Sequence, residues 1–190
     1  MQRARVITNG GHMWFDTRAA ILTAGVGEGT SQIVAFDSAL RSAAIADFNL
    51  IRVTSIVPPR VSVYVLQSGL DSLSGEGCML PAVYAVSYSS DPGRILSAGV
   101  GVGVPLDTNQ SGVIFTNDGV SINEVNCIAR LESMVEEGMT RLRGINAYEF
   151  RCASASTEVT EGGEWRAAVA AVCFADEHLW QYFADAVKIQ

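Results

Sequence analysis

The chain has 190 residues, of which 48% are hydrophobic and only 17% are charged, with a net charge of −7. The length fits one domain over residues 1–190, and the sparse charge suggests that part of the surface is buried against copies of the chain. The acidic balance argues against a nucleic-acid partner, whose phosphates require clustered lysine and arginine, and it permits a cationic small-molecule substrate. No apolar stretch approaches the roughly 20 residues of a membrane helix, so we expect no membrane partner and a cytoplasmic location.

Rare residue types argue against several kinds of chemistry. The single lysine, Lys188, lies two residues before the end, a poor place for the rigidly held Schiff base of pyridoxal phosphate. The two histidines, His12 and His178, leave few options for a metal site or a Ser-His-Asp arrangement, and we expect neither to be catalytic. The four cysteines include no C-x-x-C pair, so zinc and thioredoxin-like chemistry have no support and no metal is expected.

The N-terminal part predicts a strand followed by a helix. Ala19–Val26 is an apolar run typical of a buried strand, and the glycines of Gly25–Gly29 are interpreted as a turn. A G-x-G-x-G nucleotide-binding loop is the weaker alternative, because the third spacing and a βαβ context are missing. Thr30 or Ser31 can cap a helix that runs to about Ala46. Its predicted apolar stripe consists of Ile33, Phe36, Leu40, Ala43 and Ala44.

Asn49–Val57 is the next predicted strand, and Pro58 and Pro59 terminate it. Further strands are predicted at Val61–Leu66, Met79–Tyr88, Ile95–Val104, Val113–Phe115, Tyr148–Thr157 and Trp165–Phe174. One face of Gly99–Gly103 is bare backbone, against which another element can pack closely. About seven mostly sequential strands with two widely separated helices favour an α+β sandwich over a doubly wound fold.

A second helix is predicted to begin at the capping box Ser121-Ile122-Asn123-Glu124 and to end near Arg143, with Gly144 as its stop. Its predicted buried stripe consists of Ile122, Val125, Ile128, Leu131, Val135, Met139 and Leu142.

The Thr54–Ser55 pair carries a specific chemical possibility. A serine hydroxyl can attack the carbonyl of the preceding residue and turn the amide into an ester. β-Elimination then breaks the chain, and hydrolysis of the resulting dehydroalanine leaves a pyruvoyl group and releases ammonia. Its ketone can serve as the electron sink that other decarboxylases obtain from pyridoxal phosphate. A Thr-Ser pair alone does not establish this chemistry, so the surrounding residues decide.

Those surroundings resemble the pyruvoyl-dependent arginine decarboxylases. The resemblance is carried by Ala24-Gly25 through Glu28-Gly29, Ala35–Leu40, Asn49–Arg52 and the block Thr54-Ser55-Ile56-Val57-Pro58-Pro59. It implies an αββα sandwich of mainly antiparallel sheets with two principal helices. It also implies a proenzyme that cleaves itself into residues 1–54 and a pyruvoyl-bearing chain of residues 55–190, with active sites between the subunits of trimers. Together with the low charge and the bare Gly99–Gly103 face, it predicts a homotrimer or a dimer of trimers.

The resemblance also implies roles for individual residues. Ser55 becomes the pyruvoyl group, Thr54 becomes the new C-terminus, and Asn49 matches the asparagine that assists cleavage. A side-chain amide suits that task because it can polarise a carbonyl or hold an oxyanion. Asp37 matches the acidic residue that meets the guanidinium of arginine, a pairing that can be bidentate; a solvated helix residue is the alternative.

One position departs from the family pattern. Where the family carries a proton-donating glutamate, alignment on Gly112 and Gly119 places Thr116, whose hydroxyl is a poor acid near neutral pH. Asp118 lies on the same strand face, if the strand extends that far, and can take over. The leading hypothesis is therefore a pyruvoyl-dependent decarboxylase that acts on arginine or a related cationic amino acid through a Schiff base. The alternative is a non-catalytic or regulatory homologue that keeps the fold and the trimer.

Overall fold

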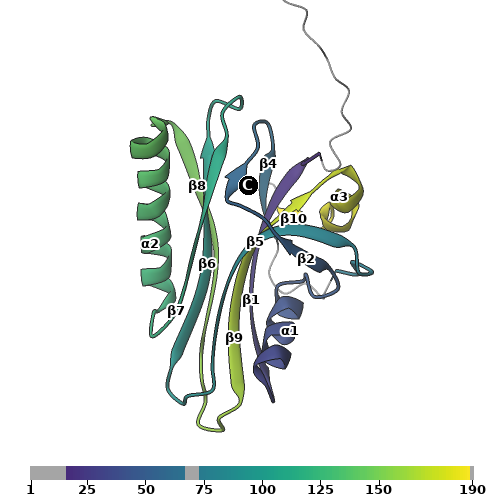
Figure 1. Ribbon diagram of the computed structural model, residues 1–190, viewed down its shortest axis with the longest axis vertical. Coiled ribbons are helices and arrows are strands. Elements are labelled where there is room, and N and C mark those ends of the chain that lie inside the picture. Colours follow the sequence, from purple (N-terminus) through teal and green to yellow (C-terminus); the bar gives the residue numbers. More distant parts are fainter. Residues whose placement is uncertain (1–15, 67–72, 189–190) are drawn as a thin grey trace, which may run out of the picture.

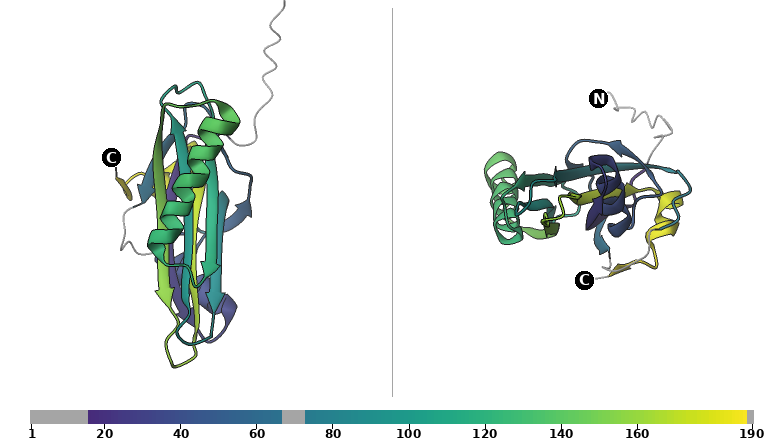
Figure 2. Two further views of the ribbon diagram at one scale, coloured as in Figure 1. Left: turned by 90° about the vertical axis from the view of Figure 1, so that its left-hand side faces the viewer. Right: turned by 90° about the horizontal axis from the view of Figure 1, so that it is seen from below.

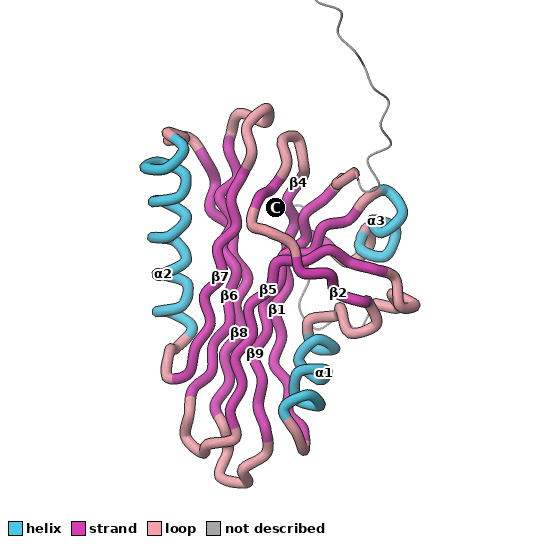
Figure 3. Tube along the Cα trace, viewed as in Figure 1, coloured by secondary structure: helices cyan, strands magenta, loops and turns pink. Residues whose placement is uncertain are grey.

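A computed structural model describes residues 16–66 and 73–188, so His12 lies outside the described residues. The described chain forms four layers, a helix, two sheets and further helices (Figures 1 and 3). The strands are β1 (Ala19–Gly29), β2 (Asn49–Arg52), β3 (Ile56–Val57), β4 (Ser62–Leu66), β5 (Met79–Ser89), β6 (Ile95–Pro105), β7 (Gly112–Val120), β8 (Tyr148–Glu158), β9 (Trp165–Ala175) and β10 (Val187–Lys188). The helices are α1 (Gln32–Ser42), α2 (Glu124–Glu136) and α3 (Glu177–Phe183). The α+β sandwich is confirmed.

The two sheets differ in the number and order of their strands. The six-stranded sheet has the order β10-β4-β1-β9-β5-β2, and the four-stranded sheet has the order β3-β7-β6-β8. Most neighbours are antiparallel, whereas β1 and β4, and β2 and β5, run parallel. Helix α2 covers the outer face of the four-stranded sheet, and α1 lies on the opposite side of the molecule, against the six-stranded sheet (Figure 2). Within the described residues, no helix is long and apolar enough to span a membrane.

Alternating side chains of both sheets form the central core. Because successive residues of a strand point to opposite faces, every second residue of β1, β6 and β9 enters the space between the sheets. Buried members of this core are Ala20, Leu22, Val57, Val63, Val83, Ala85, Leu96, Ala98, Val100, Val102, Ile114, Val159, Ala168, Ala170, Val172 and Phe174. Separate clusters lie beneath α1 and α3 and beneath α2, which gives the four layers three apolar interfaces.

Helix α1 lies directly on a glycine face of β1. A Cβ atom at Gly27 would lie 2.2 Å from the backbone nitrogen of Ala39, and one at Gly25 would lie 2.5 Å from the Ala39 carbonyl oxygen. The turn predicted at Gly25–Gly29 is therefore wrong, because these residues are strand residues whose missing side chains make room for the helix.

The same close approach changes the buried face of α1. Ser31 caps the helix as predicted, accepting a hydrogen bond from the Val34 amide, but the helix ends at Ser42. Alanines face the glycines, with Ala35 and Ala39 fully buried, whereas Ile33 is 70% exposed. The predicted stripe was therefore wrong at Ile33, since small side chains are what allow a helix backbone to approach a sheet this closely.

Helix α2 packs on the second glycine face, for which the sequence predicted close packing of an element that it did not identify. A Cβ at Gly99 would lie 2.8 Å from a methyl carbon of Leu131, and one at Gly103 would lie 2.6 Å from the side chain of Met139. The glycines of β6 are therefore covered by a helix of the same chain. These glycines therefore give no support to the predicted contacts between copies of the chain, which were inferred in part from them.

Both ends of this helical segment differ in detail from the prediction. The N-cap is Asn123, whose side chain accepts from the Asn126 amide, while Ser121 has a φ of 69° outside the helix. A π-helical turn, Glu137–Arg141, follows α2 and adds a residue to the turn, so that Leu142 rotates into solvent and is 62% exposed. Gly144, with a φ of 68°, stops the segment as predicted.

Candidate active site

The chain crosses from one sheet to the other at Val53–Ser55. Upstream, β2 pairs with β5 in the six-stranded sheet, and the Val53 amide continues the pairing by donating to the Ala82 carbonyl at 3.1 Å. Downstream, β3 pairs with β7 in the four-stranded sheet, and the Ser55 carbonyl accepts from the Ile114 amide at 3.0 Å. The predicted continuous strand Asn49–Val57 is therefore wrong, because its two halves belong to different sheets.

The backbone makes a tight turn around Ser55. The Ile56 amide donates to the Thr54 carbonyl oxygen at 3.1 Å, which closes a three-residue turn with Ser55 at its centre. A donor on this oxygen polarises the carbonyl carbon that a nucleophile would attack. The side chain of Ser55 is exposed and, within the described part of the chain, its hydroxyl has no hydrogen-bond partner. The turn therefore combines a free hydroxyl with a polarised neighbouring carbonyl.

An apolar pocket adjoins this turn. It encloses about 200 Å³ and is lined in part by Val53, Thr54 and Ile56 of the crossing segment. Pro81 of β5 and Phe174 of β9 contribute further apolar surface. Such a pocket can accept the aliphatic part of a small molecule next to Ser55.

The inner face of β7 carries Ile114, Thr116 and Asp118. Ile114 belongs to the core between the sheets, whereas Val113 packs toward α2, so the even-numbered residues point toward the six-stranded sheet. The strand was predicted only for Val113–Phe115, but it continues to Val120. Asp118 thus shares the face of Thr116, about 7 Å further along the strand.

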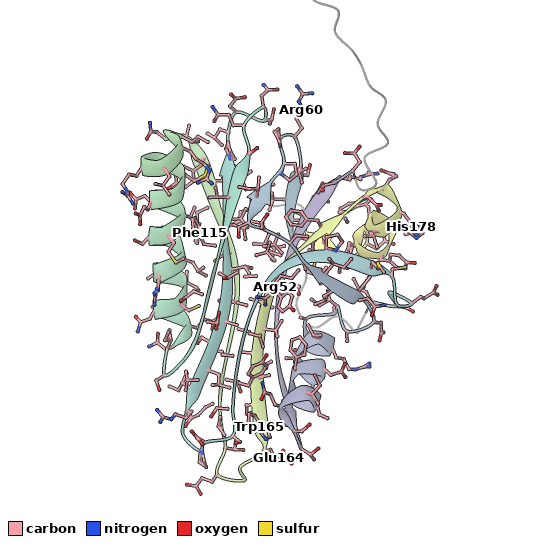
Figure 4. All side chains as sticks on the ribbon, viewed as in Figure 1. Arg52, Arg60, Phe115, Glu164, Trp165 and His178 are labelled. Carbon is pink, nitrogen blue, oxygen red and sulfur yellow. The ribbon has the colours of Figure 1, made fainter. Side chains whose placement is uncertain are left out.

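The charge of Asp118 is set by two opposing effects. Desolvation by the surrounding protein raises the pKa of its carboxyl above the usual value, and the positive charge of Arg52 lowers it in part. Arg52 ends β2 and is exposed; it is labelled near the middle of the view in Figure 4. Its guanidinium carbon lies 4.2 Å from the centre of the Tyr84 ring, and Nη2 donates to the Tyr84 carbonyl at 3.3 Å.

Asn49 and Asp37 lie apart from the turn in a single chain. Asn49 begins β2 and its side-chain amide donates to the Gly77 carbonyl at 2.6 Å. The extended strand alone places it about 10 Å from Arg52 along the chain. Asp37 is exposed on α1. In the described part of the chain, neither side chain forms a hydrogen bond with Ser55.

Three participants were missed by the sequence analysis: Ile56 and Ile114, which donate backbone hydrogen bonds, and Arg52. A signal was available only for Arg52, which is the single charged residue within Asn49–Val57. The backbone donors leave no trace in residue type, since any residue but proline supplies an amide hydrogen.

These features define a class: an αββα sandwich with an exposed serine at the crossing between its sheets. The family model described as pyruvoyl-dependent arginine decarboxylase matches residues 19–179, and the chain belongs to this family. A pyruvoyl-dependent arginine decarboxylase of Pyrococcus horikoshii is 35% identical over 162 residues, which cover 84% of this chain and 96% of the relative.

Two further relatives carry closely similar names. The pyruvoyl-dependent arginine decarboxylase of Methanopyrus kandleri is 35% identical over 153 residues, covering 80% of this chain and 93% of the relative. Pyruvoyl-dependent arginine decarboxylase 1 of Methanosarcina mazei is 27% identical over 157 residues, covering 83% and 94%. The similarity thus extends over nearly the whole length of each relative.

Proposed function

We propose that the chain is a single-domain, self-processing pyruvoyl-dependent decarboxylase of arginine or a related cationic amino acid. Membership of the family supports the class of reaction. The observation that carries the proposal is the turn at Ser55, where a free hydroxyl follows a carbonyl that accepts the Ile56 amide hydrogen. The cytoplasmic location expected from the sequence stays a prediction.

Self-processing would use only atoms of the chain and one water molecule. The Ser55 oxygen attacks the Thr54 carbonyl carbon, and the peptide nitrogen leaves it, so that the amide becomes an ester. Removal of the Ser55 α-proton expels the Thr54 carboxylate and leaves a dehydroalanine. Addition of water releases ammonia and leaves a ketone at position 55. The Ile56 amide supports the first step, because its hydrogen bond strengthens as negative charge develops on the Thr54 oxygen.

The residues around position 55 fit a pyruvoyl group. The carbonyl of residue 55 lies on the downstream side of the broken bond and keeps its Ile114 donor at 3.0 Å. When present, the group supplies a ketone that withdraws electrons from a bound amino acid as carbon dioxide leaves. The apolar pocket lined by Val53 and Ile56 would exclude water from the aliphatic part of the substrate.

Two carboxylates have proposed roles toward the substrate. Asp37 would pair with the cationic side chain, where a carboxylate can accept two hydrogen bonds from a guanidinium. Asp118 would deliver the proton that replaces the carboxyl group. Its raised pKa supports this role, because a carboxyl that holds its proton to higher pH is a better acid near neutrality.

The proposed site also requires a second copy of the chain. Asn49 and Asp37 are separated from Ser55 in one chain, and next to Asp37 the helix exposes Ile33 (70%) and Val34 (47%). A hollow of about 320 Å³ adjoins this apolar surface, lined by Ser31, Gln32, Ile33, Phe36 and Tyr88. We propose a homotrimer or a dimer of trimers in which these residues meet Ser55 of a neighbour. Sedimentation should show the trimer, and a monomer at micromolar concentration would contradict it.

Intact mass under denaturing conditions tests the proposal directly. The parent should give two chains divided between Thr54 and Ser55, the Ser55→Ala variant should give one chain, and Asn49→Ala should cleave slowly. If Ser55→Ala is still cut at this bond, a contaminating protease is responsible and self-processing is refuted.

A second function is favoured by one observation. Alignment on Gly112 and Gly119 places Thr116 at the position of the family's proton donor, which favours a non-catalytic or regulatory homologue that keeps the fold and the trimer. A single full-length chain in the parent preparation, with no carbon dioxide released from arginine, lysine or ornithine, would support this alternative.

A further inference from the structure

A further cavity lies among the β3–β4 turn, the β6–β7 loop and β8. It encloses about 300 Å³, which is within the range of small-molecule sites. Arg60, which lines it, lies at the end of the molecule away from Glu164 and Trp165 (Figure 4). Pro58 lines both this cavity and the pocket beside Ser55. The two spaces therefore share one wall, three residues downstream of Ser55.

Arg151 of β8 brings a largely buried positive charge to this cavity. It lies opposite Val102, a member of the core between the sheets, so its side chain points to the same inner face. The side chain is 23% exposed. Its Nη1 donates to the Val63 carbonyl oxygen of β4 at 2.5 Å, and its Nη2 donates to the Glu149 carboxylate at 2.8 Å. Because a guanidinium has five N–H donors, Arg151 can also bind a ligand.

Arg60 supplies a second positive charge. Its φ of 64° lies in the left-handed region, which residues other than glycine adopt mainly where neighbouring contacts hold them. Here the Arg60 amide donates to the Thr108 carbonyl oxygen at 2.8 Å, and Nε and Nη2 donate to Oδ1 of Asn109 at 3.3 and 2.9 Å. Asp107 accepts from the backbone and side-chain amides of Asn109, not from the guanidinium. Among the described residues no carboxylate forms an ion pair with Arg60, so its charge is available to a ligand.

The lining of the cavity favours an anion with a short hydrocarbon body. The residues that line it, or form ion pairs with those residues, carry two arginines against one glutamate, which leaves one positive charge in excess. A guanidinium binds a carboxylate through charge-assisted hydrogen bonds that can be bidentate. Val57, Val61 and Val104 supply apolar walls for the rest of such a molecule.

We propose that this cavity is a binding site for a small organic carboxylate, whose carboxylate group is held by Arg60 and Arg151 and whose apolar body lies against the valines. The site is separate from the serine at which self-processing is proposed, and binding there requires no cleavage of the chain. Through Pro58, a bound carboxylate would contact the segment that carries Ser55.

The test uses butyrate as the probe, titrated against the full chain at constant ionic strength and followed by saturation-transfer NMR. A molecule of this size should bind with a dissociation constant in the low millimolar range. Butyramide has the same shape without the charge, and it should bind at least about 10-fold more weakly, because the charge-assisted hydrogen bonds are lost. Acetate, which lacks two methylene groups, should also bind about 10-fold more weakly. Inorganic phosphate should bind more weakly than butyrate, since it cannot use the apolar walls.

Variants assign the bound butyrate to this cavity. Arg60→Gln and Arg151→Gln should each weaken butyrate binding at least about 10-fold. Glu149→Gln should tighten it, because the carboxylate that competes for Arg151 is removed, and a purely structural role of Glu149 would not produce this gain. Arg130→Gln, an exposed arginine on α2, is the matched control and should bind butyrate like the parent. If Arg151→Gln does not fold, because the bond that joins β8 to β4 is lost, Arg60→Gln and Glu149→Gln carry the test.

The outcomes separate this inference from the proposed function. Butyrate that binds folded Arg60→Gln as tightly as the parent would occupy another place, such as the pocket beside Ser55, and the inference would be overturned. Equal binding of butyramide, tighter binding of phosphate, or half-saturation only above about 100 mM butyrate would each overturn it as well. A parent chain that stays whole would refute self-processing and leave the carboxylate site unaffected.

Discussion

Ser55 is tied to Ile114 by a backbone hydrogen bond of 3.0 Å that lies entirely downstream of the Thr54–Ser55 bond. On the upstream side, Val53 is tied to Ala82 of the other sheet at 3.1 Å. Breaking the peptide bond between these anchors would therefore leave each new end attached to its own sheet.

The two pieces should remain one particle after cleavage. Residues 1–54 contain β1, which lies between β4 and β9 in the six-stranded sheet, and α1, which packs on β1. Native size-exclusion chromatography should elute both pieces together, at the volume of Ser55→Ala, and only denaturant should separate them. Loss of the smaller piece on a native column would contradict this expectation.

Asp118 and Thr116 should control turnover rather than cleavage. Loss of a general acid costs about 10²- to 10⁴-fold in rate, so Asp118→Asn should lower carbon dioxide release by at least about 100-fold and leave processing unchanged. Thr116→Glu should raise turnover if the missing glutamate limits the parent. Release that survives Asp118→Asn unchanged would eliminate Asp118 as the acid.

The pH dependence has a defined sign. A proton donor acts while protonated, so turnover should fall as pH rises through the raised pKa of Asp118. Because the folded pKa exceeds the unfolded one, the stability contributed by this group is present at low pH and is lost as pH rises through the folded value. Compared with Ser55→Ala alone, the double variant Ser55→Ala/Asp118→Asn should therefore gain more stability at pH 7 than at pH 3, as measured by urea unfolding. An equal effect at both pH values would exclude the shift.

Asp37→Asn should chiefly weaken substrate binding. The change removes a charge-assisted pair worth about 1.5–3 kcal/mol, or roughly 10- to 150-fold in affinity. Steady-state assays with labelled arginine should show the effect in KM with little change in processing. Asp91→Asn, in the turn after β5, is a matched control for a lost surface charge. Parent-like KM in Asp37→Asn would leave Asp37 as a solvated helix residue.

Gly27→Ala should destabilise the fold strongly. Its Cβ would lie 2.2 Å from the backbone nitrogen of Ala39, which no change of rotamer can relieve, so a loss at or above about 3 kcal/mol is expected. Gly162→Ala is the matched control, since a Cβ there meets nothing within 4 Å. Urea unfolding in the Ser55→Ala background measures both. Equal midpoints would show that α1 can move away from β1 without cost.

Much of the sandwich was predictable because alternation of apolar residues is a local property. The strand beginning at Ile95 was found in this way, whereas the cap at Thr30 or Ser31 and the Gly144 stop followed from the local residue preferences of helix ends. The burial of Ala35 in place of Ile33 was not, because it depends on a glycine face elsewhere in the chain. The break after Arg52 was also invisible, since the apolar pattern continues across it while the hydrogen-bond partners change sheets.

The site was predictable only where a motif recorded it. Thr54 and Ser55 followed from their neighbours, and the placement of Asp118 on the face of Thr116 followed from the period of a strand. The contact of Arg52 with Tyr84 joins residues far apart in sequence, and no residue pattern in either segment predicts it. The separation of Asn49 from Ser55 within one chain likewise depends on how β2 is directed.

The position of the proposed cleavage at the crossing between the sheets also affects how reversibly the protein unfolds. Before cleavage, a denatured chain can refold by itself, because β1 and its neighbours β4 and β9 are parts of one polymer. After the proposed cleavage, the same sheet would have to be rebuilt from two molecules that first have to meet, so recovery from denaturation would depend on concentration and compete with aggregation. The Thr54–Ser55 bond would then be needed only for the first folding of the chain, and a processed molecule that fully unfolds would refold far less readily than the intact one.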